Sequence, residues 1–341
     1  MSRIPSIESL VDNVVSKGAD CNKKNRDNSL SLVVPAPDNE ENIDVSVVTV
    51  CFNPLEGGRQ ELFQKNLDSV QAQEGVRIEH VIIDGASSDG TIQWLMDYKN
   101  TNHNICILSK EDTGIYDAMN RGIALAKGKY IIFLNSDDYF HDASGMAVSV
   151  SRLESLHCDF SFAPIRFSDP SVHHHPQQAP QKRLHRFLIS WSFSHQSMLT
   201  TRAMLIKMDG FDTTYKSAAD YDLLLRMIVA GAKGCYVPLT FSTFTLGGFS
   251  CSPENQELVE NECVRILQRF YYVFYSVNMT YVDVKHILKH RIYPHKYLTI
   301  YKHSQKLIKE RFIGIPQSPL NWISQSFNYI KYYNRCLRSK V

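Results

Sequence analysis

The stretch KYIIFLNSDDYF, Lys129 to Phe140, decides the fold. Tyr130 to Leu134 is an unbroken run of apolar residues, which is typical of a strand buried on both faces of a parallel sheet. The run stops at the polar sequence Asn135, Ser136, Asp137 and Asp138. Open α/β sheets bind ligands at the carboxyl ends of their strands, and carboxylate oxygens suit Mg²⁺ or Mn²⁺. The stretch therefore predicts a cation site shared with substrate phosphates, and a plain polar turn is the alternative.

The residues around this strand repeat one pattern. Apolar runs typical of strands lie at 45–52, 77–83, 105–108 and 130–134, and stripes typical of helices lie between them at 58–73, 91–98 and 115–126. Strands that alternate with helices predict a doubly wound, mostly parallel sheet with right-handed crossovers. Further strands are expected at 159–167, 198–201 and 235–245, and further helices at 143–156, 220–228, 254–275 and 282–290.

Four polar loops are brought together by this topology. They hold Asn53, then Asp84 with Asp89, then Glu111 with Asp112, and finally Asn135 to Asp138. Because each loop follows a parallel strand, all four lie at the same edge of the sheet. In the second loop, DGASSDGT, glycines permit tight turns, and a carboxylate there could accept a hydrogen bond from a nucleobase or a ribose. An Asx turn that caps the next helix is the alternative.

Composition and length indicate an ordinary soluble globular protein. The chain has 341 residues, 43% hydrophobic and 21% charged. We expect a flexible lead-in at 1–42, a main domain at 43–252 and a basic, aromatic-rich helical region at 253–341. No secretory signal or membrane-spanning run is expected, so the predicted location is the cytoplasm. The eight cysteines form no Cys-x-x-Cys pair, which favours buried thiols over a zinc site.

The carboxyl-terminal residues carry the positive charge. Residues 281–341 contain twelve Lys and Arg against two acids, whereas the whole chain has a net charge of only +2. Tyrosines are interleaved with these bases, a mixture that suits a membrane surface. Single-stranded nucleic acid and packing in a homodimer are the alternatives. Nothing in the body of the chain indicates a nucleic-acid module, so we expect peripheral contact with the cytoplasmic face of a membrane.

Two further segments contain candidate site residues. His195 and Gln196 lie near Trp191, and an aromatic ring with polar neighbours suits an acceptor or a sugar. Asp220 and Asp222 lie in the first turn of a predicted helix, where acids compensate the helix dipole. Asp222 fits that structural role, whereas Asp220 could instead face the cleft as a base. The run His173 to His175 indicates an exposed loop rather than a metal site.

Four blocks of this sequence resemble the family 2 glycosyltransferases. They are SVVTVCFN, VIIDGASSDGT, DTGIYDAMNRGIALAKGKYIIFLNSDD and, as the last block, FSHQSM followed by DGFD and ADYDLLLR, over about residues 45–250. The resemblance implies a GT-A (Rossmann-like) fold and inverting transfer from a nucleotide-sugar, with UDP the expected carrier. It is closest to enzymes of bacterial exopolysaccharide, capsule or O-antigen assembly. A glycan or lipid-linked acceptor is therefore expected.

The resemblance also implies roles for single residues. Thr49, Asn53, Asp84, Asp89, Asp112, Asn135 and Ser136 would bind the donor nucleotide. Asp137 would hold a divalent cation, manganese or magnesium, on the diphosphate. Asp220 would be the catalytic base, and Trp191, His195 and Gln196 would contact the sugar or the acceptor.

Three residues depart from the family pattern. Asn135 replaces the first acid of Asp-x-Asp, Ala219 replaces the Glu of Glu-Asp, and Met119 stands where many relatives have Arg. Two other functions therefore stay open. One is a sugar-phosphate nucleotidyltransferase, which would release pyrophosphate. The other is a non-catalytic subunit that binds a nucleotide-sugar without turnover.

Overall fold

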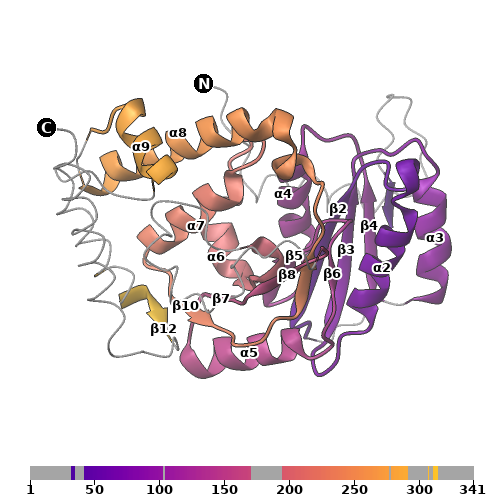
Figure 1. Ribbon diagram of the computed structural model, residues 1–341. Coiled ribbons are helices and arrows are strands. Elements are labelled where there is room, and N and C mark those ends of the chain that lie inside the picture. Colours follow the sequence, from indigo (N-terminus) through magenta and orange to yellow (C-terminus); the bar gives the residue numbers. More distant parts are fainter. Residues whose placement is uncertain are drawn as a thin grey trace, which may run out of the picture.

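Helices cover both faces of one large sheet (Figure 1). The computed structural model describes residues 32–34, 42–102, 104–169, 194–275, 278–290, 306 and 310–313. The mixed α/β fold with a mostly parallel sheet is confirmed.

The elements have the following bounds. The strands are β1 Leu32–Val34, β2 Val45–Cys51, β3 Ile78–Asp84, β4 Ile105–Ser109, β5 Tyr130–Phe133, β6 Tyr139–Phe140, β7 Phe160–Phe162, β8 Ile165–Phe167, β9 Thr200–Thr201, β10 Gly234–Tyr236, β11 Ser242–Phe244 and β12 Phe312–Ile313. The α-helices are α2 Gln60–Gln71, α3 Thr91–Thr101, α4 Ile115–Leu125, α5 Gly145–Leu156, α6 Arg202–Lys207, α7 Ala219–Val229, α8 Gln256–Tyr275 and α9 Tyr281–His290. Short 3₁₀ turns lie at η1 Glu56–Gly58, η5 His195–Ser197, η6 Phe249–Cys251 and η7 Pro253–Asn255.

The large sheet has the strand order β1-β4-β3-β2-β5-β9-β7-β10-β12. Strands β2 to β5 are parallel, and in register Cys51 pairs with Asp84, which pairs with Ser109. Strand β9 runs antiparallel between β5 and β7. Because the parallel strands end side by side, the loops that follow them share one edge of the sheet, as the sequence predicts.

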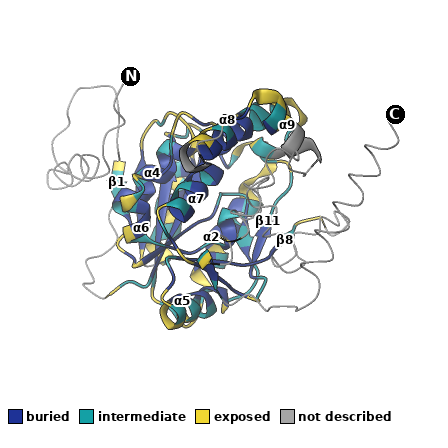
Figure 2. Ribbon diagram, turned by 90° about the vertical axis from the view of Figure 1, so that its left-hand side faces the viewer, coloured by how far each residue is buried: buried dark blue, intermediate teal, exposed yellow. Residues whose placement is uncertain are grey.

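Strand β2 lies inside the sheet between β3 and β5, and both of its faces are covered by apolar clusters. Val48 and Val50 pack in a cluster with α4, α7 and α8, whereas Val45 and Val47 pack in a second cluster with α5 on the opposite face. This alternation follows from the two-residue period of a strand. Figure 2 shows buried residues along the sheet and on the inner sides of the helices, with exposed residues on their outer sides.

Two expected strands are each divided between two sheets. The predicted strand 159–167 becomes β7 and β8, and the predicted strand 235–245 becomes β10 and β11. Pro164 and Pro238 lie at the two breaks. Proline has no N–H for a central ladder, so the chain leaves the large sheet at each of them. Strands β8 and β11 then form a small sheet with β6, in the order β6-β11-β8.

The two ends of the chain also contribute to the core. Residues 32–34, expected in the flexible lead-in, form β1 and pair antiparallel with β4. Helix α8, placed by the sequence in a separate region from 253, shares an apolar cluster with α7. Strand β12, in the segment expected to be helical, pairs with β10. The core is thus continuous across the predicted boundaries at 42 and 252.

Five cysteines of the described residues, Cys51, Cys106, Cys158, Cys235 and Cys263, are buried, in line with the prediction of buried thiols. No helix in this part of the chain is long and apolar enough to cross a bilayer.

Candidate functional site

The loop after β3 is held together by the Asp84 carboxylate. Asp84 is fully buried, and its Oδ2 accepts hydrogen bonds from the Ser87 N–H at 3.0 Å and the Ser109 hydroxyl at 2.6 Å. Its Oδ1 accepts from the Ser87 hydroxyl. The carboxylate expected to bind the nucleotide therefore shapes the loop from inside, and its direct contact with a donor stays a prediction.

Asn53 and Asp89 join this loop to the loop after β2. The Asn53 N–H donates to Ser87 Oγ at 2.8 Å, and Asn53 Oδ1 accepts from the Ser88 N–H at 2.9 Å. Asp89 Oδ2 accepts from the Leu55 N–H at 2.8 Å. Although burial acts to raise the pKa of Asp89, hydrogen bonds from Thr91 and from backbone N–H groups hold it below its usual value. Both residues thus fix the mutual position of two loops at the predicted nucleotide site.

Asp112 and Phe52 lie on either side of Gly85. A Cβ on Gly85 would lie 2.8 Å from Asp112 Oδ2 and 3.3 Å from the Phe52 ring, so only glycine lets the three loops meet so closely. Burial raises the pKa of the Asp112 carboxyl, while the Gly114 N–H acts in the opposite direction. Phe52 is 62% exposed. In the sequence Phe52 is the last residue of the predicted strand 45–52, so nothing there indicated that its ring is exposed at the site.

A row of buried polar side chains runs from β3 to residues 135–138, which we call the acidic loop. His80 Nε2 lies 2.9 Å from Thr49 Oγ1, and the Thr49 hydroxyl lies 3.5 Å from Asn66 Oδ1. Asn66 Nδ2 donates at 2.8 Å to the carbonyl oxygens of both Asn135 and Asp138. Thr49, expected to line the nucleoside pocket, is fully buried. In this structure it supports the acidic loop from below.

The buried His80 should make the stability of the folded protein depend on pH. Burial lowers the pKa of His80 to about 3 from the usual 6.5. The folded protein therefore binds fewer protons than the unfolded chain between these values, so stability is complete above about pH 6.5 and falls toward pH 3, by up to about 1.4 kcal/mol per pH unit. We expect His80→Gln to flatten the decline of the thermal midpoint between pH 6.5 and 4.5, because the amide keeps a partner for Thr49 and does not titrate.

The control for this experiment is His157→Asn, which changes an exposed imidazole at the end of α5. Its midpoints should follow the wild-type pH dependence. Equal slopes for His80→Gln and the wild type would contradict the role of His80.

Two side chains of the acidic loop, Asn135 and Asp137, have oxygen atoms that receive no hydrogen bond from another described residue. The Asn135 Oδ1 atom is buried with no hydrogen-bond partner among the described residues. The half-buried Asp137 carboxylate receives no hydrogen bond from another residue in the same part of the chain, and Ser136 lies half-buried between the two. Burial raises the pKa of Asp137, while the charges of Arg59 and His195 act to lower it.

Asp138 is the buried member of the loop, and the sequence analysis gave it no role. Its Oδ2 accepts from Gln196 Nε2 at 2.7 Å, and its Oδ1 accepts from the Thr245 N–H at 2.8 Å. Burial and the neighbouring Asp137 charge raise the pKa of Asp138 to about 7. Gln196 is only 1% exposed, so here it orients the acidic loop, and the acceptor contact expected of it stays a prediction.

His195 lies between the acidic loop and the amino end of α7. Its Nδ1 is 3.3 Å from Asp220 Oδ2, and the next residue, Gln196, donates to Asp138 of the acidic loop. The Tyr116 hydroxyl donates to Asp220 Oδ1 at 3.3 Å. Residues from four distant parts of the sequence thus gather at one place. Trp191, the remaining predicted acceptor residue, lies outside the described residues, as does the run His173 to His175.

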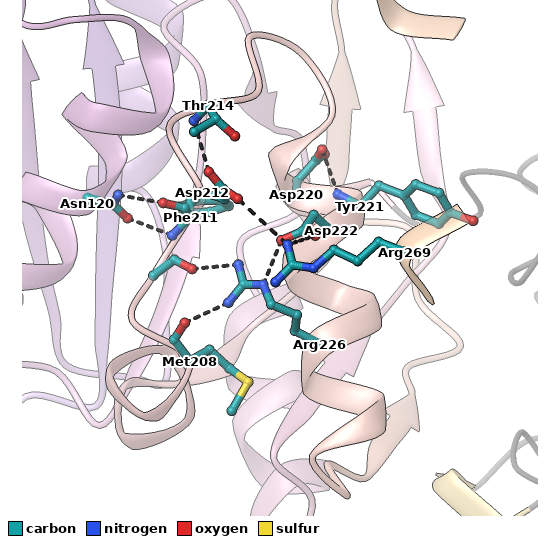
Figure 3. A network of polar contacts seen from close by, with 11 residues as sticks. Asn120, Met208, Phe211, Asp212, Thr214, Asp220, Tyr221, Asp222, Arg226 and Arg269 are labelled. Carbon is teal, nitrogen blue, oxygen red and sulfur yellow. Dashed lines mark hydrogen bonds and ion pairs between the residues drawn. The ribbon is translucent and has the colours of Figure 1, made fainter. Parts of the chain in front are cut away.

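The predicted role of Asp222 as a dipole-compensating acid is incomplete. Its Oδ2 accepts from Arg226 Nε at 2.6 Å, and Arg226 also donates to the carbonyl oxygens of Met208 and Gly210 (Figure 3). Asp222 is 3% exposed. It therefore works through a buried ion pair that secures the segment before α7.

The donor set of the acidic loop fits a hard divalent cation. Carboxylate and amide oxygens are available on Asp137 and Asn135, and the latter has no partner among the described residues. No group of three or more His, Cys, Asp or Glu suited to a metal lies in that part of the chain. A cation here would take most of its ligands from a diphosphate and water, as Mg²⁺ commonly does.

Comparisons with known proteins identify the family of this chain. The profile of Glycosyl transferase family 2 matches residues 46–213. An uncharacterized glycosyltransferase of Mycobacterium tuberculosis is 31% identical over 200 residues, which cover 53% of this chain and 68% of that protein.

Two solved structures share the fold. TarS 1–349 of S. aureus, in complex with UDP-GlcNAc, has a TM-score of 0.53 at 15% identity, covering 79% of this chain and 89% of that one. The mannosyltransferase PcManGT of Pyrobaculum calidifontis, in complex with GDP-Man and Mn²⁺, has a TM-score of 0.53 at 17% identity, covering 89% and 81%. On the sequence matches, the chain belongs to glycosyl transferase family 2 and is a glycosyltransferase.

Proposed function

We propose that this enzyme transfers a sugar, with inversion, from a nucleotide-sugar to a hydroxyl group of a glycan or lipid-linked acceptor. The observation that carries the proposal is the short turn η5, where His195 contacts Asp220 and the next residue, Gln196, donates a hydrogen bond to Asp138 of the acidic loop. The loop suited to a cation and the carboxylate suited to a proton are therefore joined by one turn. UDP is the proposed carrier, since a fold relative binds UDP-GlcNAc, and GDP is the competitor.

The nucleotide would lie over the loops after β2, β3 and β4. The exposed Phe52 ring offers a flat apolar surface to a base, and the Asn53 and Ser88 region offers polar groups to a ribose. The diphosphate would then reach the loop after β5, where Asp137 and Asn135 would hold a manganese or magnesium ion. Such an ion neutralises the charge that develops on a departing nucleoside diphosphate.

Asp220 would accept the proton of the acceptor hydroxyl. As that oxygen bonds to the anomeric carbon, the bond from this carbon to the diphosphate oxygen breaks on the opposite face, and the electron pair leaves with the nucleoside diphosphate. The Tyr116 hydroxyl and the Tyr221 N–H, at 3.3 and 2.9 Å from Asp220 Oδ1, hold the carboxylate in place. Oδ2, next to His195, is then the oxygen that faces the proton.

Cytoplasmic location and membrane contact through residues 281–341 also stay proposals. Most of this segment lies outside the described residues. Among the bases described, Lys285 lies 3.5 Å from Glu260, and Arg311 donates to the Gly231 carbonyl at 3.0 Å. These two bases are used within the chain, so any anionic surface would have to be met by the others.

A donor screen tests the proposed function. UDP-, GDP- and dTDP-sugars are added with Mn²⁺, and the thermal midpoint and the release of nucleoside diphosphate are measured. One donor at about 100 times its Kd should add about 2.7 kcal/mol of stability, which is several degrees. A shift with none of the donors would contradict the proposal, and release of pyrophosphate with a sugar phosphate and a nucleoside triphosphate would favour a nucleotidyltransferase.

A further inference from the structure

Helix α8 packs on α7, the helix that carries Asp220, and both helices lie beyond the family match at 46–213. Val264, Leu267 and Tyr271 of α8 lie in one apolar cluster with Leu224 and Ile228 of α7. Figure 1 shows α8 at the top of the view, above α7. The last long helix of the described chain is therefore in contact with the candidate base's own helix.

Glu262 of α8 reaches the backbone just before α7. Its Oε1 accepts from the Lys216 N–H at 2.7 Å, and its Oε2 accepts from the N–H groups of Ser217 and Ala218 at 2.9 and 3.0 Å. Glu262 is 6% exposed. The first N–H groups of a helix have no partner within it, and Ala218 at the cap position has no side chain to supply one. The buried Glu262 carboxylate instead binds the three N–H groups that lead into the helix, those of residues 216–218.

Two arginines on the same face of α8 contact other residues of the segment before α7 and of α7 itself. Arg265 and Arg269 follow Glu262 by three and seven residues, so the three side chains lie on one side of the helix. The Arg265 guanidinium is 5.2 Å from the centre of the Tyr215 ring. Arg269 Nη1 lies 3.8 Å from Asp212 Oδ2 and 3.7 Å from Asp222 Oδ1 (Figure 3).

The beginning of the segment is fixed by α4. Asn120 exchanges two hydrogen bonds with the backbone of Phe211, at 2.8 and 2.9 Å (Figure 3). Residues 211–218 are thus held at one end by α4 and at the other by α8. Asp220 follows two residues later, and its side-chain contacts with Tyr116 and His195 are both long, at 3.3 Å. The position of its carboxylate therefore depends mainly on where the first turn of α7 lies.

We infer that Glu262 is a positioning residue, which sets the place of the Asp220 carboxylate through the amide groups of residues 216–218. The inference rests on the proposed function, in which Asp220 takes the acceptor proton. It assigns to α8 a part in the reaction without contact with the donor or the acceptor. A displacement of about 1 Å in a reacting group is enough to lower a rate by about 10²-fold.

The test is Glu262→Gln, with Glu257→Gln as a matched control on the exposed side of the same helix. The glutamine amide has only one acceptor oxygen, and its NH₂ group cannot accept from the N–H groups of residues 216–218. Some of these hydrogen bonds are therefore lost, and the segment 211–218 becomes less rigid. Hydrogen exchange of residues 211–222 should become at least about tenfold faster at the amides released, since lost protection follows the lost bonds. Turnover per donor-binding site should fall about 10- to 100-fold, with the KM for the donor changed less than about threefold.

Each outcome decides the matter. If Glu262→Gln leaves hydrogen exchange unchanged, or keeps turnover within threefold of wild type, the positioning role is overturned. It is also overturned if Glu257→Gln loses as much turnover as Glu262→Gln. Absence of transfer by the wild type overturns the proposed function, and with it this inference. If Glu262→Gln does not fold, Arg269→Gln, whose side chain is 56% exposed, takes its place. It should lower turnover at least threefold at constant donor affinity, and wild-type turnover would contradict the inference.

Discussion

Asp220→Asn should lower the rate of sugar transfer by about 10²- to 10⁴-fold, the usual contribution of a positioned general base. The amide has the same shape as the carboxylate and keeps an oxygen for the Tyr221 N–H, but it cannot take a proton. Donor affinity should stay within about threefold of wild type, because in the proposed function Asp220 contacts the acceptor and not the donor. Steady-state rates give the first quantity, and calorimetric titration with the chosen nucleotide-sugar gives the second.

Asp97→Asn is the control for this variant. Asp97 is an exposed acid on α3, and its contact in the structure is a hydrogen bond from Gln93 at 3.2 Å. It should transfer sugar at the wild-type rate. Transfer by Asp220→Asn at that same rate would mean that another group takes the proton, and His195 would be the next residue to change.

Asp137→Asn should weaken the binding of the nucleotide-sugar in the presence of Mn²⁺ by at least about 10-fold, since even indirect partners of a metal are worth 10- to 100-fold in affinity. Without the cation, wild type and variant should bind the donor equally, because the lost carboxylate acts through the ion. The measurement is the Kd of the donor as a function of Mn²⁺ concentration.

Asn135→Asp is the reciprocal variant. It restores the first acid of the Asp-x-Asp pattern, so it should lower the Mn²⁺ concentration needed for half-maximal binding. It should also destabilise the protein without the cation, because a third carboxylate then joins Asp137 and the buried Asp138. A Mn²⁺ dependence unchanged in both variants would contradict a cation site in this loop.

Much of the fold follows from local sequence patterns. Unbroken apolar runs such as 45–51 and 130–133 predict buried parallel strands, and parallel strands bring their following loops to one edge. Strand β9 lies within the strand expected at 198–201, but its antiparallel place between β5 and β7 was not predictable in this way. The division of two strands at Pro164 and Pro238 was not predictable either. A short strand has no periodicity of its own, and its position depends on neighbours far away in the sequence.

The directions of the side chains at the candidate site could not be predicted from the sequence. Thr49 and Gln196 point into the protein, to His80 and Asp138 respectively. A strand covered on both faces shows no alternation of polar and apolar residues, so its sequence does not tell which side chains face a ligand. Glu262 carried no signal at all, since its partners are backbone amides 44 to 46 residues earlier in the chain.

The pairing of β12 with β10 has a practical consequence for shortened versions of this enzyme. Phe312 packs edge-on against Phe160 and Phe162, and its strand covers the last edge of the large sheet. A bare edge offers a row of N–H and C=O groups to any other chain and promotes aggregation. A protein truncated to remove the basic segment should therefore end after Ile313, because one that ends at His290 would leave β10 open to intermolecular strand pairing.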